Sequence, residues 1–181
     1  MRIISGKYRG TILKGHNIDG TRPTMDRVKE SLIAMVQTNL KNAVILDLFT
    51  GSGSVGLEMI SNGAKSAYLV DKNPKVIETL KVNLKKLNPD EQVNLIKKDF
   101  KDACLYFKNN NIKFDVIFLD PPYELKYINP SIKLIKEYNL LNEDGIIICE
   151  SEFEEVDPQS YEIYKERKYG SKKIIILKGN N

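Results

Sequence analysis

Short apolar runs alternate with amphipathic stretches along most of this chain. The apolar runs are four to six residues long, as in buried strands, and between them apolar residues recur at helical spacing. The expected strands are 43–46, 66–70, 93–96, 114–119 and 145–149, and the expected helices are 54–61, 74–87, 101–108 and 130–138. Continuous apolar strands that alternate with helices predict a doubly wound α/β fold, in which a parallel sheet is covered on both faces.

The N-terminal part of the chain follows a different pattern. Two β-prone runs, 2–4 and 10–13, flank turn glycines and predict a β-hairpin. A helix is expected over 25–40, because its apolar residues recur at helical spacing, and Thr24 is its expected N-cap.

The C-terminal part also departs from the alternation. The β-prone runs 161–168 and 172–178 flank a Tyr-Gly-Ser turn and predict an antiparallel hairpin. This hairpin would complete a mostly parallel sheet of seven strands. The organisation that we expect is an N-terminal hairpin extension over residues 1–20 and one domain over residues 21–181.

Composition indicates a soluble globular protein. The chain has 181 residues, 41% of them hydrophobic and 29% charged, which suits one domain. No apolar run approaches the roughly 20 residues that cross a bilayer, and the first ten residues lack the apolar segment of a secretory signal. A single histidine, His16, and two distant cysteines, Cys104 and Cys149, make neither a zinc site nor a disulfide framework. We expect a cytoplasmic, metal-free monomer.

The net charge of +4 is concentrated in the first sixth of the chain. Residues 1–30 contain seven basic and three acidic side chains, whereas the remainder contains 21 of each sign. Such an asymmetry is typical of a polyanion-binding arm, because Lys and Arg neutralise phosphates. A solvated basic surface with no partner explains the charge equally well, so both interpretations stay open at this point.

A glycine-rich turn follows the first strand of the alternating region, in the segment LDLFTGSGSVG. Glycines let a backbone approach a ligand closely, and the helix that begins after them favours electronegative groups. Asp47 precedes the turn, Asp71 ends the next strand, 18 residues beyond Gly53, and Asp99 ends the strand after that. Asp71 has the place of the carboxylate that binds ribose hydroxyls, although it could instead cap the helix that begins near Asn73. A carboxylate beside the turn disfavours a pyrophosphate and suits a ligand amino group, which favours S-adenosylmethionine over NAD.

The segment Asp120-Pro121-Pro122-Tyr123 directly follows an expected buried strand. Two prolines make a rigid turn that presents carbonyl groups. An acid, such carbonyls and an aromatic ring suit a flat base with an exocyclic amine: Asp120 and the Pro121 carbonyl would accept the two amine hydrogens, and Tyr123 would stack on the ring. These hydrogen bonds would free the nitrogen lone pair for attack on a methyl group, and Asp120 would offset the positive charge that develops on nitrogen.

The acids and the glycine turn resemble the cofactor motifs of class I methyltransferases, and the DPPY segment resembles the catalytic motif of enzymes that methylate adenine N6 or guanine N2. Together with MRIISGKYRG, TRPTMDRVKESL and RKYGSKKI, they make the chain similar, from residue 1 to about 178, to the bacterial 16S ribosomal RNA guanine-N2 methyltransferase family. The resemblance implies a Rossmann-like methyltransferase sheet. It also implies methyl transfer from S-adenosylmethionine to one guanine of an assembled or assembling small ribosomal subunit.

The resemblance also implies a role for particular residues. The implied catalytic residues are Asp120, Pro121, Pro122 and Tyr123. The implied cofactor-binding residues are Asp47, Phe49, Thr50, Gly51, Ser52, Gly53, Asp71, Asp99 and Phe100. The implied RNA-binding residues are Arg2, Lys7, Arg9, Arg22 and Arg27. The chain departs from the family pattern at Thr50, where an alanine is expected.

Two other functions remain open. A DNA or RNA adenine-N6 methyltransferase would use the same DPPY chemistry, but a DNA enzyme would usually need an added recognition domain, for which 181 residues leave no room. A non-catalytic RNA-binding factor of ribosome assembly could keep the fold, although it would not need Asp120, Tyr123 and the three cofactor acids together.

Overall fold

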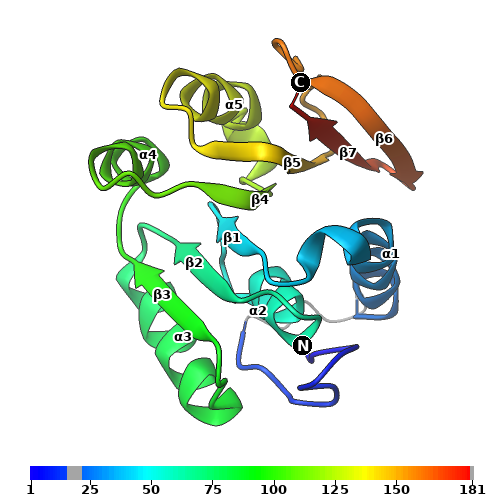
Figure 1. Ribbon diagram of the computed structural model, residues 1–181. Helices are drawn as coiled ribbons and strands as arrows, with labels where there is room; N and C mark the ends of the chain where they lie inside the picture. Colours follow the sequence, from blue (N-terminus) through cyan, green and yellow to red (C-terminus); the bar gives the residue numbers. More distant parts are fainter. Residues whose placement is uncertain (16–21, 180–181) are drawn as a thin grey trace.

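The computed structural model describes residues 1–15 and 22–179, and of residues 22–25 it describes the backbone alone. One seven-stranded sheet runs through the molecule in the order β3-β2-β1-β4-β5-β7-β6 (Figure 1). The strands are β1 Val44–Asp47, β2 Ser66–Val70, β3 Gln92–Ile96, β4 Phe114–Leu119, β5 Leu141–Ser151, β6 Glu162–Tyr169 and β7 Lys172–Lys178. The pairs among β1 to β5 are parallel, and β7 pairs antiparallel with both β5 and β6. The expected fold class is therefore confirmed.

Helices cover both faces of the sheet (Figure 1). They are α1 Arg22–Leu40, α2 Ser54–Ser61, α3 Pro74–Leu87, α4 Phe100–Asn109 and α5 Ile128–Glu137, with a short 3₁₀ helix at Tyr123–Leu125. The first three pack on one face, where residues such as Ile45 and Phe118 point, and α4 and α5 pack on the other, where Leu46 and Leu119 point. Consecutive strand residues point to opposite faces of the sheet, and both faces are buried. The strands are therefore continuous apolar runs in the sequence.

The order of the strands defines where a ligand would bind. From β1 the chain moves outward to β2 and β3, and then returns to β4 on the other side of β1. In open α/β sheets, ligands bind outside the carboxyl ends of the strands at such a reversal. The loops that follow β1 and β4 meet there, and they are the glycine turn and the DPPY segment.

The N-terminal segment turns back on itself as expected, but its two arms are too short to be strands. Its only bridge within the described residues joins Arg2 and Ile12, and it contains no strand. The N–H groups of Ile3 and Leu13 donate across the segment to the carbonyls of Thr11 and Met1, at 2.9 Å each. The N–H groups of Ile4 and Ser5 donate to the buried carboxylate of Glu58 in α2, at 2.7–3.1 Å. The two arms therefore pair as a short antiparallel hairpin, although one bridge is too little for a strand, and Glu58 anchors this segment to α2.

Two further local predictions need correction. Thr24 is not the N-cap of α1, because the helix begins at Arg22 and Thr24 lies inside it. Pro23 is tolerated there because N–H groups in the first helical turn have no intrahelical acceptor. Strand β5 begins at Leu141 instead of residue 145, since Leu141 pairs with Phe114 ahead of an irregularity in the β4–β5 register.

Candidate active site

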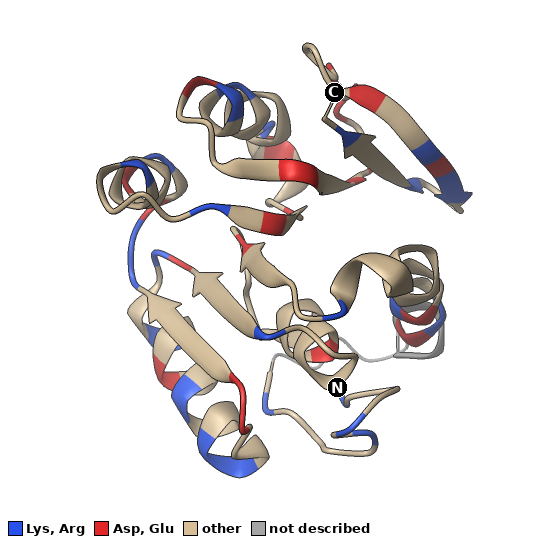
Figure 2. Cartoon of the chain, in the orientation of Figure 1, with Lys and Arg blue, Asp and Glu red and all other residues tan. Residues whose placement is uncertain are grey.

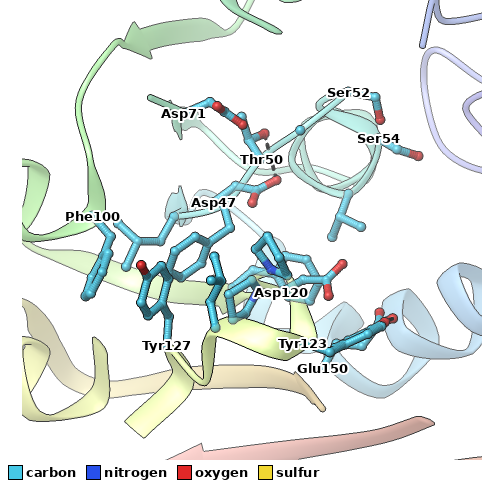
Figure 3. A pocket seen from close by; sticks show the side chains of 18 of the residues that line it. Asp47, Thr50, Ser52, Ser54, Asp71, Phe100, Asp120, Tyr123, Tyr127 and Glu150 are labelled. Carbon is cyan, nitrogen blue, oxygen red and sulfur yellow. Dashed lines mark hydrogen bonds between the residues drawn. The ribbon is translucent and has the colours of Figure 1, made fainter. Parts of the chain in front are cut away.

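A cavity of about 550 Å³ lies at the carboxyl ends of β1, β2, β4 and β5 (Figure 3). It contains both sequence motifs: the glycine turn lines one part of it and the DPPY segment another. Twelve of the thirteen catalytic and cofactor residues implied by the family resemblance line the cavity, and Gly53 is the exception. Gly53 is the N-cap of α2, where its left-handed backbone, φ 79°, turns the chain into the helix.

Asp47 is the most buried acid of the cavity, with 1% of its surface exposed. Its Oδ2 accepts hydrogen bonds from the Thr50 hydroxyl, at 3.0 Å, and from the Gly56 N–H, at 3.2 Å. Its Oδ1 is buried and has no partner in the described part of the chain. Burial raises the pKa of Asp47 to about 7, against the opposing effect of these hydrogen bonds. An unpartnered carboxyl oxygen on a residue that lines the cavity suits a ligand that brings a cationic donor.

The two other strand-end acids also line this part of the cavity, and each makes a structural contact. Asp71 accepts a hydrogen bond from the Asn73 N–H at 2.8 Å, but the N-cap of α3 is Asn73 itself, so Asp71 does not have the capping role considered from the sequence. Asp99 is the N-cap of α4 and accepts from two backbone N–H groups of its first turn. Both contacts hold one carboxylate oxygen, Oδ1, and fix the side chain at the cavity rim.

Aromatic rings form the wall beside these acids. Phe49, Phe100 and Tyr127 contact one another, with ring centroids 4.8–6.3 Å apart, and all three line the cavity (Figure 3). Such a wall suits a flat apolar group. Sequence reasoning missed Tyr127, because it lies just before α5 and belongs to no motif.

The DPPY segment brings Asp120 and Tyr123 to the other part of the cavity. Burial, and then the nearby Glu150 carboxylate, raise the pKa of Asp120 well above its usual range, while the Lys172 ammonium opposes this shift. Tyr123 begins the 3₁₀ helix directly after the rigid turn, and it lines the cavity beside Glu150 (Figure 3). Burial also raises the pKa of its hydroxyl, so Tyr123 is a neutral donor.

Glu150 and Lys172 complete this part of the cavity and were not predicted. Lys172 Nζ lies 2.5 Å from Glu150 Oε1, and the Tyr123 hydroxyl donates to the same oxygen at 3.2 Å. Burial opposes the charge on Lys172, but its contacts with Glu150 and Tyr123 outweigh that effect and raise its pKa. Glu150 belongs to no motif, and the RKYGSKKI segment that contains Lys172 gave no sign of a place in the cavity, since strand pairing alone brings both residues to Tyr123.

A buried ion pair supports the cavity from the α1 side. Lys29 Nζ lies 3.0 Å from Glu58 Oε2 and donates to the Ser54 hydroxyl and the Arg2 carbonyl. Lys29 also lines the cavity. A lysine on an amphipathic helix is expected to face the solvent, so the sequence gave no indication that Lys29 is buried and paired with Glu58.

Four of the five expected RNA-binding residues, Arg2, Lys7, Arg9 and Arg27, lie outside the cavity lining. Lys7 is paired with two acids, Asp90 and Glu91, at 2.7 and 3.2 Å. The backbone N–H of Lys7 donates to the carbonyl of Ser61, the last residue of α2. This end of α2 lies one helix length, about 12 Å, from the glycine turn.

Arg2 lies 3.5 Å from Asp26, Arg9 and Arg27 are exposed, and the side chain of Arg22 lies outside the described residues. Basic residues also lie on α3 and β6, so the charge is less localised in space than in the sequence (Figure 2). In the part of the chain that the structure describes, no helix is long and apolar enough to cross a membrane.

Comparison with known proteins places the chain in a family. The family model described as Conserved hypothetical protein 95 matches residues 1–178. The chain belongs to this family. Over 173 residues it is 36% identical to the Ribosomal RNA small subunit methyltransferase D of Haemophilus influenzae, covering 94% of this chain and 89% of that relative. The family resemblance expected from the sequence is confirmed.

Solved structures share the fold of this family member. The Escherichia coli protein YhhF matches with a TM-score of 0.83 and 28% identity, covering 98% of this chain and 97% of YhhF. SMU.776, solved as a complex with SAH, matches with a TM-score of 0.70 and 15% identity, covering 95% of this chain and 52% of SMU.776. At that identity the second likeness shows the fold alone, which is the α/β methyltransferase fold.

Proposed function

We propose that this protein transfers a methyl group from S-adenosylmethionine to the exocyclic N2 amine of one guanine in 16S ribosomal RNA. One observation carries the proposal: a single cavity at the carboxyl ends of the strands holds the unpartnered oxygen of Asp47 and the DPPY segment together. Membership of a family that includes a small-subunit rRNA methyltransferase supports the substrate class. In this proposal the protein acts as a cytoplasmic monomer, with residues 1–20 as an RNA-contacting extension.

The glycine-turn part of the cavity suits the cofactor. Asp47 Oδ1 would accept the methionyl ammonium, Asp71 the ribose hydroxyls, and Asp99 and the aromatic wall would hold the adenine. Phe49, Thr50, Gly51 and Ser52 would line the methionyl side, and Gly53 would set the turn. The bound cofactor supplies an electrophilic methyl group on a sulfonium ion. The solved SAH complex of a protein of the same fold supports this assignment.

The DPPY part performs the chemistry. Asp120 and the Pro121 carbonyl accept the two hydrogens of the guanine amine, which localises the nitrogen lone pair, and Pro122 keeps the turn rigid. Tyr123 stacks on the base. As the amine becomes positively charged, the Asp120 carboxylate stabilises that charge. The side chains need only orient the base and stabilise charge, without a covalent enzyme intermediate.

The substrate RNA would lie across the cavity mouth. A loop guanine reaches such a cavity at less cost than a paired one, because it need not leave a stack. Arg2, Arg9, Arg22 and Arg27 would contact phosphates of an assembled or assembling subunit. Lys7 would contribute less, since Asp90 and Glu91 already neutralise it.

Asp120→Asn tests the proposal. Small subunits from a strain without this protein are incubated with the enzyme and tritium-labelled S-adenosylmethionine, and the labelled nucleoside is identified by mass spectrometry. We expect N2-methylguanosine from the wild type and a rate lowered by about 10²–10³-fold in the variant, because the amide cannot offset the developing charge.

Exposed Asp102, outside the cavity, provides the control: Asp102→Asn should retain full activity. N6-methyladenosine as the product would overturn the guanine assignment and retain the chemistry. No labelled nucleoside despite bound cofactor would contradict methyl transfer to this RNA.

A further inference from the structure

We propose that Glu150 and Lys172 bind the Watson–Crick edge of the target base, and that they make the cavity accept guanine and reject adenine. The inference rests on the proposed function and names the residues that set its base specificity.

Adjacent strands place three charged side chains in a row. Asp120 follows β4, Glu150 lies in β5 and Lys172 begins β7, and these strands are neighbours in the sheet. Leu119 pairs with Cys149, so Asp120 and Glu150 are the next residues along their strands. Glu150 pairs with Ile174, two residues from Lys172, which places the glutamate and the lysine diagonally across one face. The cavity therefore presents a carboxylate, a second carboxylate and an ammonium group in that order.

Contacts hold the second carboxylate in place. Glu150 is only 7% exposed, and both Lys172 Nζ and the Tyr123 hydroxyl contact its Oε1. Among the described residues, none donates a hydrogen bond to Oε2. Glu150 thus keeps one acceptor oxygen for a ligand, beside the ring on which the base would stack (Figure 3).

This row of groups matches guanine. Along its Watson–Crick edge, guanine presents the N2 amine, the N1–H donor and the O6 acceptor in sequence. With the amine at Asp120, the N1–H faces Glu150 and O6 faces Lys172, so every polar group has a partner. Adenine with its amine at Asp120 turns the N1 lone pair toward Glu150. That contact pairs an acceptor with a carboxylate, and a buried acceptor without a donor is strongly disfavoured.

The base analogue 2-aminopurine tests this arrangement directly. It keeps the amine on C2, but its N1 is an acceptor and it has no O6. Small subunits are reconstituted with 16S rRNA carrying guanine or 2-aminopurine at the position that the nucleoside analysis identifies. We expect wild-type kcat/KM to be at least about 100-fold higher on guanine, because an analogue that lacks the recognised groups leaves buried polar side chains unpaired.

Two variants assign that preference to particular side chains. Glu150→Gln should lower kcat/KM on guanine by about 10–100-fold. It should also reduce the ratio of kcat/KM on guanine to kcat/KM on 2-aminopurine, because the amide can turn its NH2 toward N1 of 2-aminopurine. Lys172→Met should lower the rate on guanine more than on 2-aminopurine, which has no O6 to lose. Binding of S-adenosylhomocysteine, measured by calorimetry, should remain as in the wild type and reports an intact fold.

Lys173 and Glu166 provide a matched control pair on the same hairpin. They are 3.1 Å apart, half-exposed and outside the cavity lining. Lys173→Met and Glu166→Gln should retain the wild-type rate and preference.

The outcomes separate the inference from the proposed function. If the wild type methylates 2-aminopurine as fast as guanine, or if Glu150→Gln slows both by the same factor, the inference is wrong while N2-methylguanosine formation still stands. A factor common to both bases would mean that Glu150 only positions Tyr123. If the wild type forms no N2-methylguanosine on guanine-containing subunits, the proposed function fails and the inference fails with it.

Discussion

At the scale of single residues, we expect Asp47 to make cofactor binding depend on pH. Burial raises its pKa to about 7, so a large share of the cofactor-free protein has a neutral Asp47 below that pH. A ligand ammonium pairs with the ionised form. We therefore expect affinity for S-adenosylhomocysteine to rise by about tenfold between pH 6 and pH 8, and calorimetry at several pH values measures this change. Asp47→Asn should bind weakly and lose the dependence, whereas a retained dependence would assign it to another group.

Rising pH should lower the contribution of Asp47 to the stability of the cofactor-free protein, whereas it should raise the affinity for the ligand. Because the folded-state pKa lies above the value of 3.8 for an unperturbed Asp, the stabilising contribution of Asp47 is complete below pH 4 and is lost as pH rises to about 7. Asp47→Asn removes this buried charge. We expect the cofactor-free variant to exceed the wild type in free energy of unfolding at pH 8 by on the order of 2 kcal/mol, with a smaller difference at pH 5. Urea denaturation at both pH values compares them.

At the scale of elements, the N-terminal segment depends on a close approach to the end of α2. Gly6 and Gly10 both have left-handed backbones, with φ 76° and 87°, but a Cβ on Gly6 would lie 1.9 Å from the Ser61 carbonyl oxygen, and one on Gly10 would contact nothing within 4 Å. Gly10→Ala should cost about 1 kcal/mol through backbone strain alone. Gly6→Ala should cost at least about 2 kcal/mol more, because the segment must move away from α2.

Urea denaturation of the two alanine variants measures this difference, and each serves as the control for the other. Equal losses would show that backbone strain alone accounts for both substitutions and that the contact with Ser61 contributes nothing.

At the scale of the whole molecule, the Lys29–Glu58 pair joins segments that are distant in the sequence. It ties α1 to α2, and Glu58 also accepts the N–H groups of Ile4 and Ser5. Lys29→Met leaves a carboxylate buried without its counter-charge, so we expect the free energy of unfolding to fall by about 3–5 kcal/mol. Adding Glu58→Gln should recover part of that loss.

A double-mutant cycle measured by urea denaturation tests this coupling. Strictly additive losses from the two substitutions would mean that the buried pair is not coupled.

Local signals account for what could be predicted. Strands β2 and β4 and helices α2 and α3 have the bounds read from the chain, because a short apolar run or a helical repeat is complete within each segment. The glycine turn and the DPPY segment were recognisable for the same reason, because the residues of each motif lie within a few positions of one another in the sequence. The N-terminal hairpin was predictable because its two arms pair locally, whereas its anchoring to Glu58, more than 50 residues away, was not.

The sequence by itself therefore determined the fold class, the type and order of the elements and the two motifs that line the cavity. Only the tertiary structure decided which side chains stand beside them. Glu150 and Lys172 belong to different strands, and the order β4-β5-β7 brings both to Tyr123. The physical reason is that propensity and periodicity act over a few residues, whereas pairing order, burial and buried charge pairs join residues that the chain keeps far apart.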